Sequence, residues 1–229
     1  MKYDIIIFDA DETLFDFDYS EKVAFRNTML DYGFDYDENY HLKLYLEINN
    51  KLWKELENGL TTLEELKIER FDRLIKRFGA SIDSYELAEA YENHLADCSI
   101  LFEESIPLIE SLCKDYKLFI VTNGITRVQD KRIRKSEIAK YFDGITISEE
   151  VSVAKPDPKI FEYALSSCEF DKRRVLMVGD SLTSDIQGGI NYGIDTCWLN
   201  TKGKVKHGKI KPTYEIKNIM ELSKVLSRS

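Results

Sequence analysis

Two aspartates directly follow the first apolar segment of the chain and have the chemistry of a nucleophile and of a general acid/base. Asp9 and Asp11 come after the apolar residues 5–8, and Thr13 follows them. A carboxylate can attack phosphorus to form a covalent aspartyl phosphate. A second carboxylate nearby can protonate the departing oxygen and then deprotonate the attacking water. We therefore expect Asp9, at the tip of the segment, to be the nucleophile and Asp11 to be the general acid/base.

Three later loops carry polar residues of complementary kinds. Thr122 and Asn123 end one apolar segment, Asp180 follows another, and Asp185 lies five residues beyond it. Lys155 stands just before a stretch with helical spacing. Taken singly, each of these residues is more often structural than functional. Together they offer carboxylates, a hydroxyl and an ammonium group, a combination that suits a bound phosphate group.

The aspartates need a cation if they lie close together. Two like charges about 4 Å apart repel by roughly 4 kcal/mol at an effective dielectric near 20. A divalent cation with oxygen ligands, Mg²⁺ or Mn²⁺ as its substitute, would offset this repulsion. Lys155 would supply a second positive charge. The residue types therefore predict a site for a divalent cation and a phosphate group.

Short apolar segments that alternate with helical stretches predict the elements that bring these loops together. We expect strands at 3–8, 117–122, 144–148, 174–179 and 195–199, and helices at 104–114, 127–138, 158–168 and 183–192. Alternating strands and helices form a parallel sheet with right-handed crossovers. Active sites of such sheets lie at the carboxyl ends of the strands. The predicted fold is therefore an α/β, Rossmann-like doubly wound parallel sheet.

Residues 15–97 differ from the rest of the chain. They contain no comparable strand segment, and long charged stretches with helical spacing dominate at 42–57 and 62–78. We expect a helical cap domain at 15–97, inserted into a catalytic core made of residues 1–14 and 98–229. The cap segment has 10 basic and 19 acidic side chains, while the core has 22 of each. The whole net charge of −9 therefore lies on the predicted cap.

The composition restricts the class of protein. The chain has 229 residues, 43% apolar and 32% charged, which is typical of a globular domain. A pI near 5.0 argues against binding nucleic acid polymers or anionic membranes, because both require a basic surface. The apolar run at 5–8 is too short for a signal peptide or a membrane span. The four cysteines include no CxxC pair and predict reduced thiols in a cytoplasmic protein.

Together, these motifs resemble those of haloacid dehalogenase superfamily phosphatases that carry a helical cap after the first strand. The resemblance covers essentially the whole chain. It implies that Asp9, the backbone carbonyl of Asp11 and Asp180 hold Mg²⁺, and that Lys155 takes part in catalysis. The phosphate-binding groups that it implies are Thr122, the Asn123 amide and Lys155. The resemblance also implies that Thr13 and Asp185 stabilise these groups without contacting the ligand, and that Asp185 holds Lys155 or a metal-bound water in place.

Within that superfamily the chain is similar to the YjjG/YfnB group of pyrimidine 5′-nucleotidases. The supporting stretches are 48–53 and 69–71 in the cap and 195–200 and 212–216 near the C-terminus. The similarity implies hydrolysis of nucleoside monophosphates such as dUMP or dTMP. Phosphatases of small metabolites, such as phosphoglycolate or sugar phosphates, are the alternative. Dehalogenases lack the second aspartate, Asp11, and phosphosugar mutases usually have Glu where this chain has Gly179, so both are disfavoured.

Other classes of protein remain as rivals. A phospho-accepting signalling module uses similar residues but needs no insertion of this length after the first strand. A binding module without turnover would not need the full set of catalytic groups, and a dinucleotide enzyme would need the absent G-x-G-x-x-G. In the cap, Trp53 and Phe17 are candidates for stacking a nucleobase, although any single ring more often fills a helical core. Arg70 is a candidate substrate contact or an ion-pair partner. The oligomeric state stays open.

Overall fold

The computed structural model describes residues 2–204 and 208–227. Its centre is a sheet of six parallel strands in the order β3-β2-β1-β4-β5-β6. The strands are β1 (Ile5–Phe8), β2 (Lys117–Thr122), β3 (Gly144–Ile147), β4 (Val175–Gly179), β5 (Asp195–Leu199) and β6 (Tyr214–Ile216). The predicted doubly wound sheet is confirmed, and its five predicted strands are present. The sixth strand, three residues with an exposed glutamate at its centre, has no apolar run that would have predicted it.

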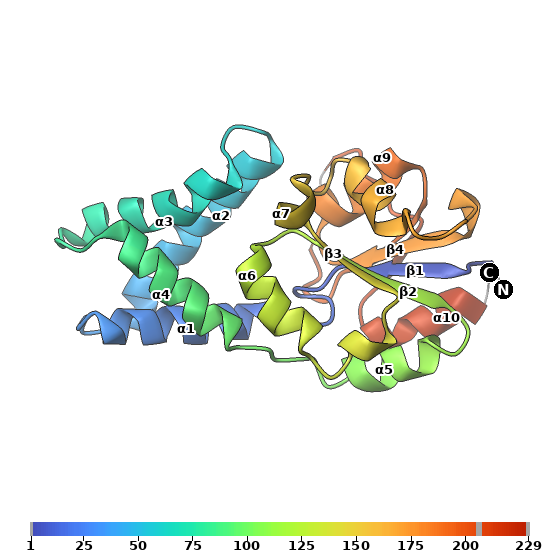
Figure 1. Cartoon of the computed structure of the whole chain (residues 1–229), viewed down its shortest axis with the longest axis horizontal. Helices are drawn as coiled ribbons and strands as arrows, with labels where there is room; N and C mark the ends of the chain where they lie inside the picture. Colours follow the sequence, from blue (N-terminus) through green and yellow to red (C-terminus); the bar gives the residue numbers. More distant parts are fainter. Residues whose placement is uncertain (1, 205–207, 228–229) are drawn as a thin grey trace.

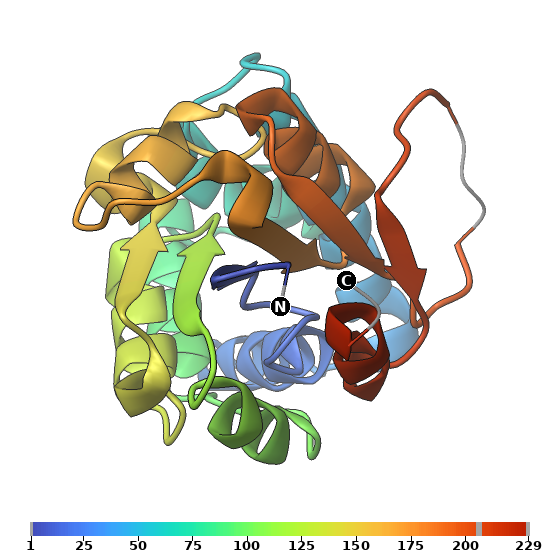
Figure 2. The ribbon, with the colours of Figure 1, turned by 90° about the vertical axis from the view of Figure 1, so that its right-hand side faces the viewer.

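Helices cover both faces of the sheet (Figures 1 and 2). One face packs against α5 (Ser105–Leu112) and α10 (Leu222–Ser227), and the other against α8 (Lys159–Leu165) and α9 (Gln187–Tyr192). The side chains of β1 alternate between the two layers, with Ile6 and Phe8 in the first and Ile5 and Ile7 in the second. Because β1 is buried on both faces, its sequence is continuously apolar.

Four further helices gather beside the sheet, at the left of Figure 1, and share a core of their own. They are α1 (Phe17–Asp31), α2 (Lys43–Glu57), α3 (Leu63–Phe78) and α4 (Ser84–Ala96). Buried aromatic rings fill this core, including Phe25 and Tyr45, whose centroids lie 4.4 Å apart. Helix α3 begins with a capping box between Thr62 and Glu65. The chain enters these helices after Phe15, which packs in the core of the sheet and bridges to Leu101.

The prediction of one continuous helix over residues 127–138 is wrong. The segment contains only α6 (Thr126–Gln129), followed by a single π-helical turn at Asp130–Arg134. The turn places Arg132 fully buried, while Ile133 packs in the core beneath the sheet. A π turn inserts one residue into the helical repeat, which rotates the side chains that follow it around the axis relative to a regular α-helix. Such π turns are frequent at functional sites.

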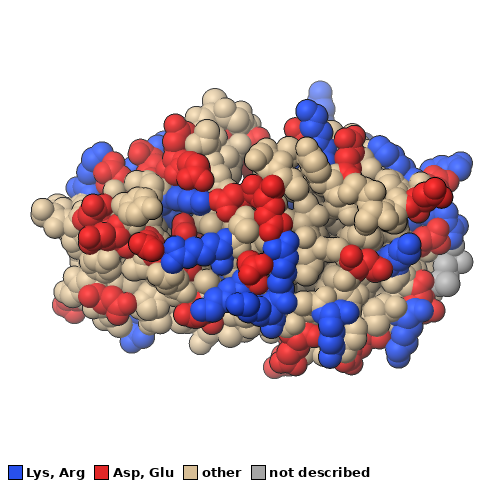
Figure 3. Space-filling view, in the orientation of Figure 1, with Lys and Arg blue, Asp and Glu red and all other residues tan. Residues whose placement is uncertain are grey.

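The short remaining elements connect the larger ones. They are α7 (Ser148–Val151), the π-helical turns Glu38–Leu42 and Leu182–Ile186, and the 3₁₀ turns Ala139–Tyr141, Lys172–Arg174 and Ile219–Glu221. Acidic and basic side chains mix over the face that Figure 3 shows. Among the residues that the structure describes, none of the helices has both the length and the apolar character needed to cross a bilayer.

Candidate active site

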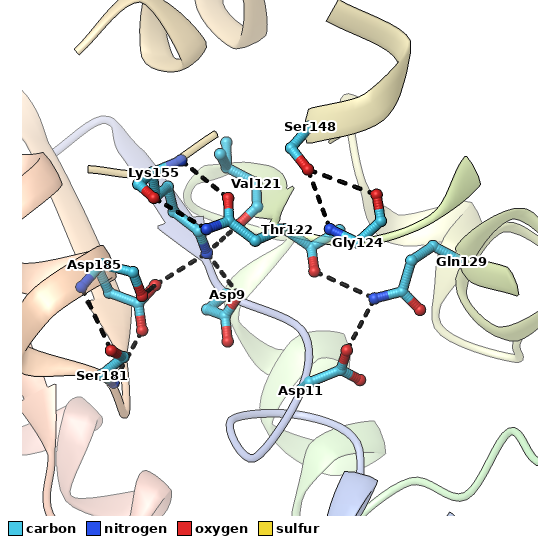
Figure 4. Close-up of polar contacts among 12 residues, drawn as sticks. Asp9, Asp11, Val121, Thr122, Gly124, Gln129, Ser148, Lys155, Ser181 and Asp185 are labelled. Carbon is cyan, nitrogen blue, oxygen red and sulfur yellow. Dashed lines mark hydrogen bonds and ion pairs between the residues drawn. The ribbon is translucent and has the colours of Figure 1, made fainter. Parts of the chain in front are cut away.

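The loops after β1, β2 and β4 and the loop before α8 meet at the carboxyl edge of the sheet (Figure 4). They line a cavity of about 310 Å³ between the sheet and the four helices α1–α4. From the sheet side the cavity is lined by Asp9, Asp11, Thr122, Asn123, Lys155 and Asp180, and from the helical side by Phe17, Asn49, Trp53 and Arg70, among others. The structure therefore brings most of the residues singled out in the sequence to one place, as the parallel topology requires.

Lys155 is the positive centre of the cavity. Its side chain is 1% exposed, and its ammonium donates to Asp9 Oδ1 at 2.5 Å and to the Val121 carbonyl at 2.6 Å. It also pairs with Asp185 Oδ1 at 2.8 Å. Burial alone would lower the pKa of Lys155, but the charges of Asp185 and Asp9 outweigh it and raise that pKa above the usual value. The lysine therefore stays protonated and can neutralise an anionic ligand.

The loop that carries Lys155 is held by the side chain of Asn123. The amide nitrogen of Asn123 donates to the carbonyl of Lys155 at 2.9 Å, and its oxygen accepts from the Lys155 amide at 2.8 Å. Both hydrogen bonds fix the backbone from which Lys155 extends. The Asn123 side chain is thus a support for the lysine, which leaves only the backbone of this residue for the ligand contact expected from the sequence.

The Asp185 carboxylate contacts Lys155, and its position depends on the absence of a side chain at Gly179. Asp185 Oδ2 accepts from the Ser181 amide at 2.9 Å while its Oδ1 faces Lys155. A Cβ placed on Gly179 would lie 2.3 Å from Asp185 Oδ2, so the carboxylate occupies the space that any side chain at position 179 would fill. Asp185 thus lies beside Lys155, while its predicted supporting role stays a prediction.

The carboxylates of Asp9 and Asp180 remain for a cation. Carboxylate oxygens of Asp9, Asp180 and Asp185 lie within 4.8 Å of one another. Burial and the charge of Asp185 raise the pKa of Asp9 well above its usual value, although Lys155 opposes the shift. Burial and Asp185 likewise raise the pKa of Asp180 to about 6. Only two ammonium groups, those of Lys155 and Lys204, are paired with these three carboxylates among the described residues. Hard carboxylate oxygens with this excess of negative charge fit a divalent cation such as Mg²⁺.

The Asp11 side chain points away from Lys155, toward α6 (Figure 4). Its Oδ2 accepts from Gln129 Nε2 at 2.7 Å, and its Oδ1 accepts from Arg132 Nη1 at 2.8 Å. Gln129 Nε2 also lies 3.2 Å from Thr122 Oγ1. Thr13 is buried behind this loop, and its hydroxyl has no hydrogen-bond partner among the described residues.

Sequence reasoning missed Gln129 and Arg132. Their spacing of three residues, shortly after Thr122, places two polar side chains on one face of a helical turn. That spacing was a signal available in the sequence, but it is common on exposed helices. Only the burial of both side chains distinguishes them.

The helical side of the cavity contributes buried polar groups as well as rings. Arg70 is 3% exposed, and its Nη2 lies 4.0 Å from Glu92. Its Nε and Nη2 have no hydrogen-bond partner among the described residues, and neither does Asn49 Oδ1. Asn49 Nδ2 donates to Glu21 at 2.8 Å. Buried donors and acceptors without partners cost free energy, which makes these groups candidates for ligand contacts.

The chain resembles known proteins both in sequence and in fold. The family model described as haloacid dehalogenase-like hydrolase matches residues 6–199. The pyrimidine 5′-nucleotidase PynA of Streptococcus pneumoniae is 38% identical, with 100% of this chain and 97% of that protein covered. The pyrimidine 5′-nucleotidase YjjG of Escherichia coli is also 38% identical, with both chains fully covered.

A solved structure provides a three-dimensional comparison. The putative hydrolase YfnB of Bacillus subtilis, crystallised with magnesium and described as revealing interdomain movement, matches with a TM-score of 0.93. It is 35% identical, and the match covers 99% of each chain. The resemblance drawn from the four motifs is thereby confirmed, and the chain belongs to the haloacid dehalogenase-like hydrolase family.

Proposed function

We propose that the protein is a Mg²⁺-dependent phosphatase that hydrolyses phosphomonoesters through an aspartyl phosphate. The observation that carries this proposal is the contact of the buried Lys155 ammonium with Asp9, whose carboxylate lies close to that of Asp180. A phosphate placed there would meet a nucleophile, a fixed positive charge and the Thr122 hydroxyl. Mg²⁺ held by Asp9, the Asp11 carbonyl and Asp180 would neutralise further charge on the phosphate oxygens.

The proposed reaction has two balanced steps. An oxygen of Asp9 attacks phosphorus, the bond from phosphorus to the ester oxygen breaks, and the departing oxygen takes a proton from Asp11. Water then attacks the aspartyl phosphate and gives its proton to Asp11, and the bond from phosphorus to Asp9 breaks. The products are an alcohol and inorganic phosphate, and both aspartates return to their starting states.

We propose nucleoside monophosphates, dUMP or dTMP among them, as the substrates. The helical side of the cavity supports this choice, because Trp53 and Phe17 offer flat apolar faces, and Arg70 and Asn49 offer polar atoms that have no hydrogen-bond partner among the described residues. A nucleobase has a flat face and a hydrogen-bonding edge. The two nucleotidases that match over the full chain point the same way. Phosphoglycolate and sugar phosphates lack a flat aromatic ring and are the alternative substrates.

We also propose the division of the chain into a cap at residues 15–97 and a core at 1–14 and 98–229. The separate hydrophobic core of α1–α4 supports it. Phe15 packs with the sheet, so the physical hinge lies one or two residues further along the chain. A cap over the cavity would exclude water during the first step. A cytoplasmic location remains part of the proposal.

The test is a phosphate-release screen with Mg²⁺ across nucleoside, sugar and short-chain acid phosphates. We expect turnover of pyrimidine nucleoside monophosphates and loss of turnover in Asp9→Asn. Preference for phosphoglycolate or a sugar phosphate would replace the nucleotide assignment. Full activity of Asp9→Asn would contradict the covalent mechanism. Accumulation of a stable phosphoprotein without turnover would instead indicate a signalling module.

A further inference from the structure

The carboxylate of Asp11 is held by two side chains that lie more than 110 residues away in the sequence. Gln129 binds Oδ2 and Arg132 binds Oδ1, so both oxygens have a defined partner. Arg132 Nη1 also donates to Gln129 Oε1 at 2.8 Å. The three side chains therefore form a closed set of hydrogen bonds that specifies the orientation of Asp11.

Both the nitrogen and the oxygen of the Gln129 side-chain amide make hydrogen bonds in this arrangement. Its nitrogen faces the oxygens of Asp11 and Thr122, and its oxygen faces Arg132. Because a carboxylate only accepts and a guanidinium only donates, the two ends of the amide cannot be exchanged without losing bonds. A Cβ at Gly124 would come within 2.8 Å of Gln129 Cγ, so the glycine provides the space for this side chain.

Arg132 contacts Asp11 and also both connecting segments that join the helices α1–α4 to the sheet. Its side chain is 0% exposed, and its Nε donates to the Cys98 carbonyl at 2.9 Å. Its guanidinium lies 5.1 Å from the ring centroid of Phe17, the first residue of α1. Ser99 in turn donates to the Arg132 carbonyl at 2.5 Å. Residues 16–17 and 97–99 are the two connections, and Arg132 contacts residues of both.

The contacts of Arg132 with the two connecting segments do not require a contact with Asp11. Arg132 Nη1 donates hydrogen bonds to Asp11 and Gln129, while its Nη2 is buried without a hydrogen-bond partner among the described residues. A buried guanidinium with an unused donor is costly. The arrangement thus favours the contact with Asp11 over full satisfaction of the arginine.

We propose that Arg132, together with Gln129, is a positioning residue for Asp11, and that it links the orientation of this carboxylate to the connections between cap and core. The inference rests on the proposed function, because it assigns a role through Asp11. Arg132 itself does not touch the substrate. Its removal would leave Asp11 free to rotate, so the proton would reach the departing oxygen less often.

The experiment compares two substrates whose departing oxygens differ in their need for a proton. A nucleoside alkoxide such as that of dTMP needs protonation, whereas 4-nitrophenolate leaves readily without it. For Arg132→Met we expect kcat/KM on dTMP, which reports only the step that forms the aspartyl phosphate, to fall about 10- to 100-fold. This loss is at or below the lower end of the ~10²- to 10⁴-fold that general acid catalysis contributes, and kcat/KM on 4-nitrophenyl phosphate should stay within about threefold of wild type. KM for dTMP should stay within about threefold, because positioning of Asp11 is not a binding contact.

A double-mutant cycle identifies Asp11 as the residue through which Arg132 acts. In an Asp11→Asn background, Arg132→Met should cause no further loss on dTMP. Arg132→Lys keeps the charge but not the paired donors, and we expect it to recover part of the rate. Gln129→Met removes the other contact to Asp11 and should show the same substrate dependence, which keeps the test available if Arg132→Met does not fold.

The control is Arg134→Met, two residues along the chain, where the arginine pairs with Glu150 and Asp130 instead. It should retain wild-type rates on both substrates. Equal losses of kcat/KM on dTMP and 4-nitrophenyl phosphate in folded Arg132→Met, or a full further loss in the Asp11→Asn background, would overturn the inference. A wild-type protein that releases phosphate from neither substrate would instead overturn the proposed function, and the inference with it.

Discussion

Substitution of Gly179 by alanine tests how tightly the phosphate-binding lysine is held. The added Cβ would lie 2.3 Å from Asp185 Oδ2, whereas ordinary contacts begin near 3.4 Å. Asp185 must therefore retreat by about 1 Å. Its hydrogen bonds to Lys155 and Ser181 are 2.8 and 2.9 Å long, and a displacement of that size breaks both.

The expected magnitude follows from those two contacts. A hydrogen bond to a charged group contributes about 1.5–3 kcal/mol, so the loss of two should lower the free energy of unfolding by about 3 kcal/mol or more. Lys155 would then lose one of its two carboxylate partners and shift toward Asp9. Because Lys155 would no longer be fixed beside the phosphate, we expect kcat/KM for phosphate release to fall by about 100-fold, the size of effect typical for the loss of one group that stabilises charge in the transition state.

Urea unfolding measures the first quantity and steady-state phosphate release measures the second. The control is Gly188→Ala in α9, where the added Cβ would lie 3.1 Å from the Phe161 ring and 3.3 Å from the Pro156 Cα, so that a shift of a few tenths of an ångström relieves the contact. That variant should stay close to wild type in both measurements. If Gly179→Ala both unfolds within about 1 kcal/mol of wild type and keeps kcat/KM within about threefold, Asp185 can move without consequence and the proposed dependence on Gly179 is refuted.

Three further predictions concern the cation and the substrate. Because the pKa of Asp180 is raised to about 6, the folded protein without Mg²⁺ loses stability as pH rises from about 4 to 6 and this carboxyl ionises. Mg²⁺ binds the ionised form, so it should raise the melting temperature more at pH 8 than at pH 5. Equal shifts at the two pH values would contradict this prediction. Lys204→Gln removes an ammonium 3.3 Å from Asp180 and should tighten Mg²⁺ binding about two- to threefold in a calorimetric titration, while weaker binding would count against it. Arg70→Met should raise KM for dTMP about tenfold and leave 4-nitrophenyl phosphate hydrolysis unchanged, and equal effects on both substrates would exclude a base contact.

Much of the fold could be predicted because buried parallel strands leave a clear pattern. Strand β1 is covered on both faces, so Ile5–Phe8 must be apolar throughout, and the polar residue that follows marks the edge of the sheet. The same holds for β2 and β4, which end next to Thr122 and Asp180. Strand β6 and the interrupted segment after α6 lack such a pattern, because their conformations depend on contacts with distant parts of the chain.

The sequence by itself determined which chemical groups meet, because strand order and polarity place Asp9, Thr122, Lys155 and Asp180 at one edge of the sheet. Only the tertiary structure decided where each side chain points. Asp11 turns toward Arg132, and Asp185 turns toward Lys155 through the space above Gly179. These directions depend on partners that are distant in sequence and on the room left by a glycine. Spacing along the chain carries no information about either.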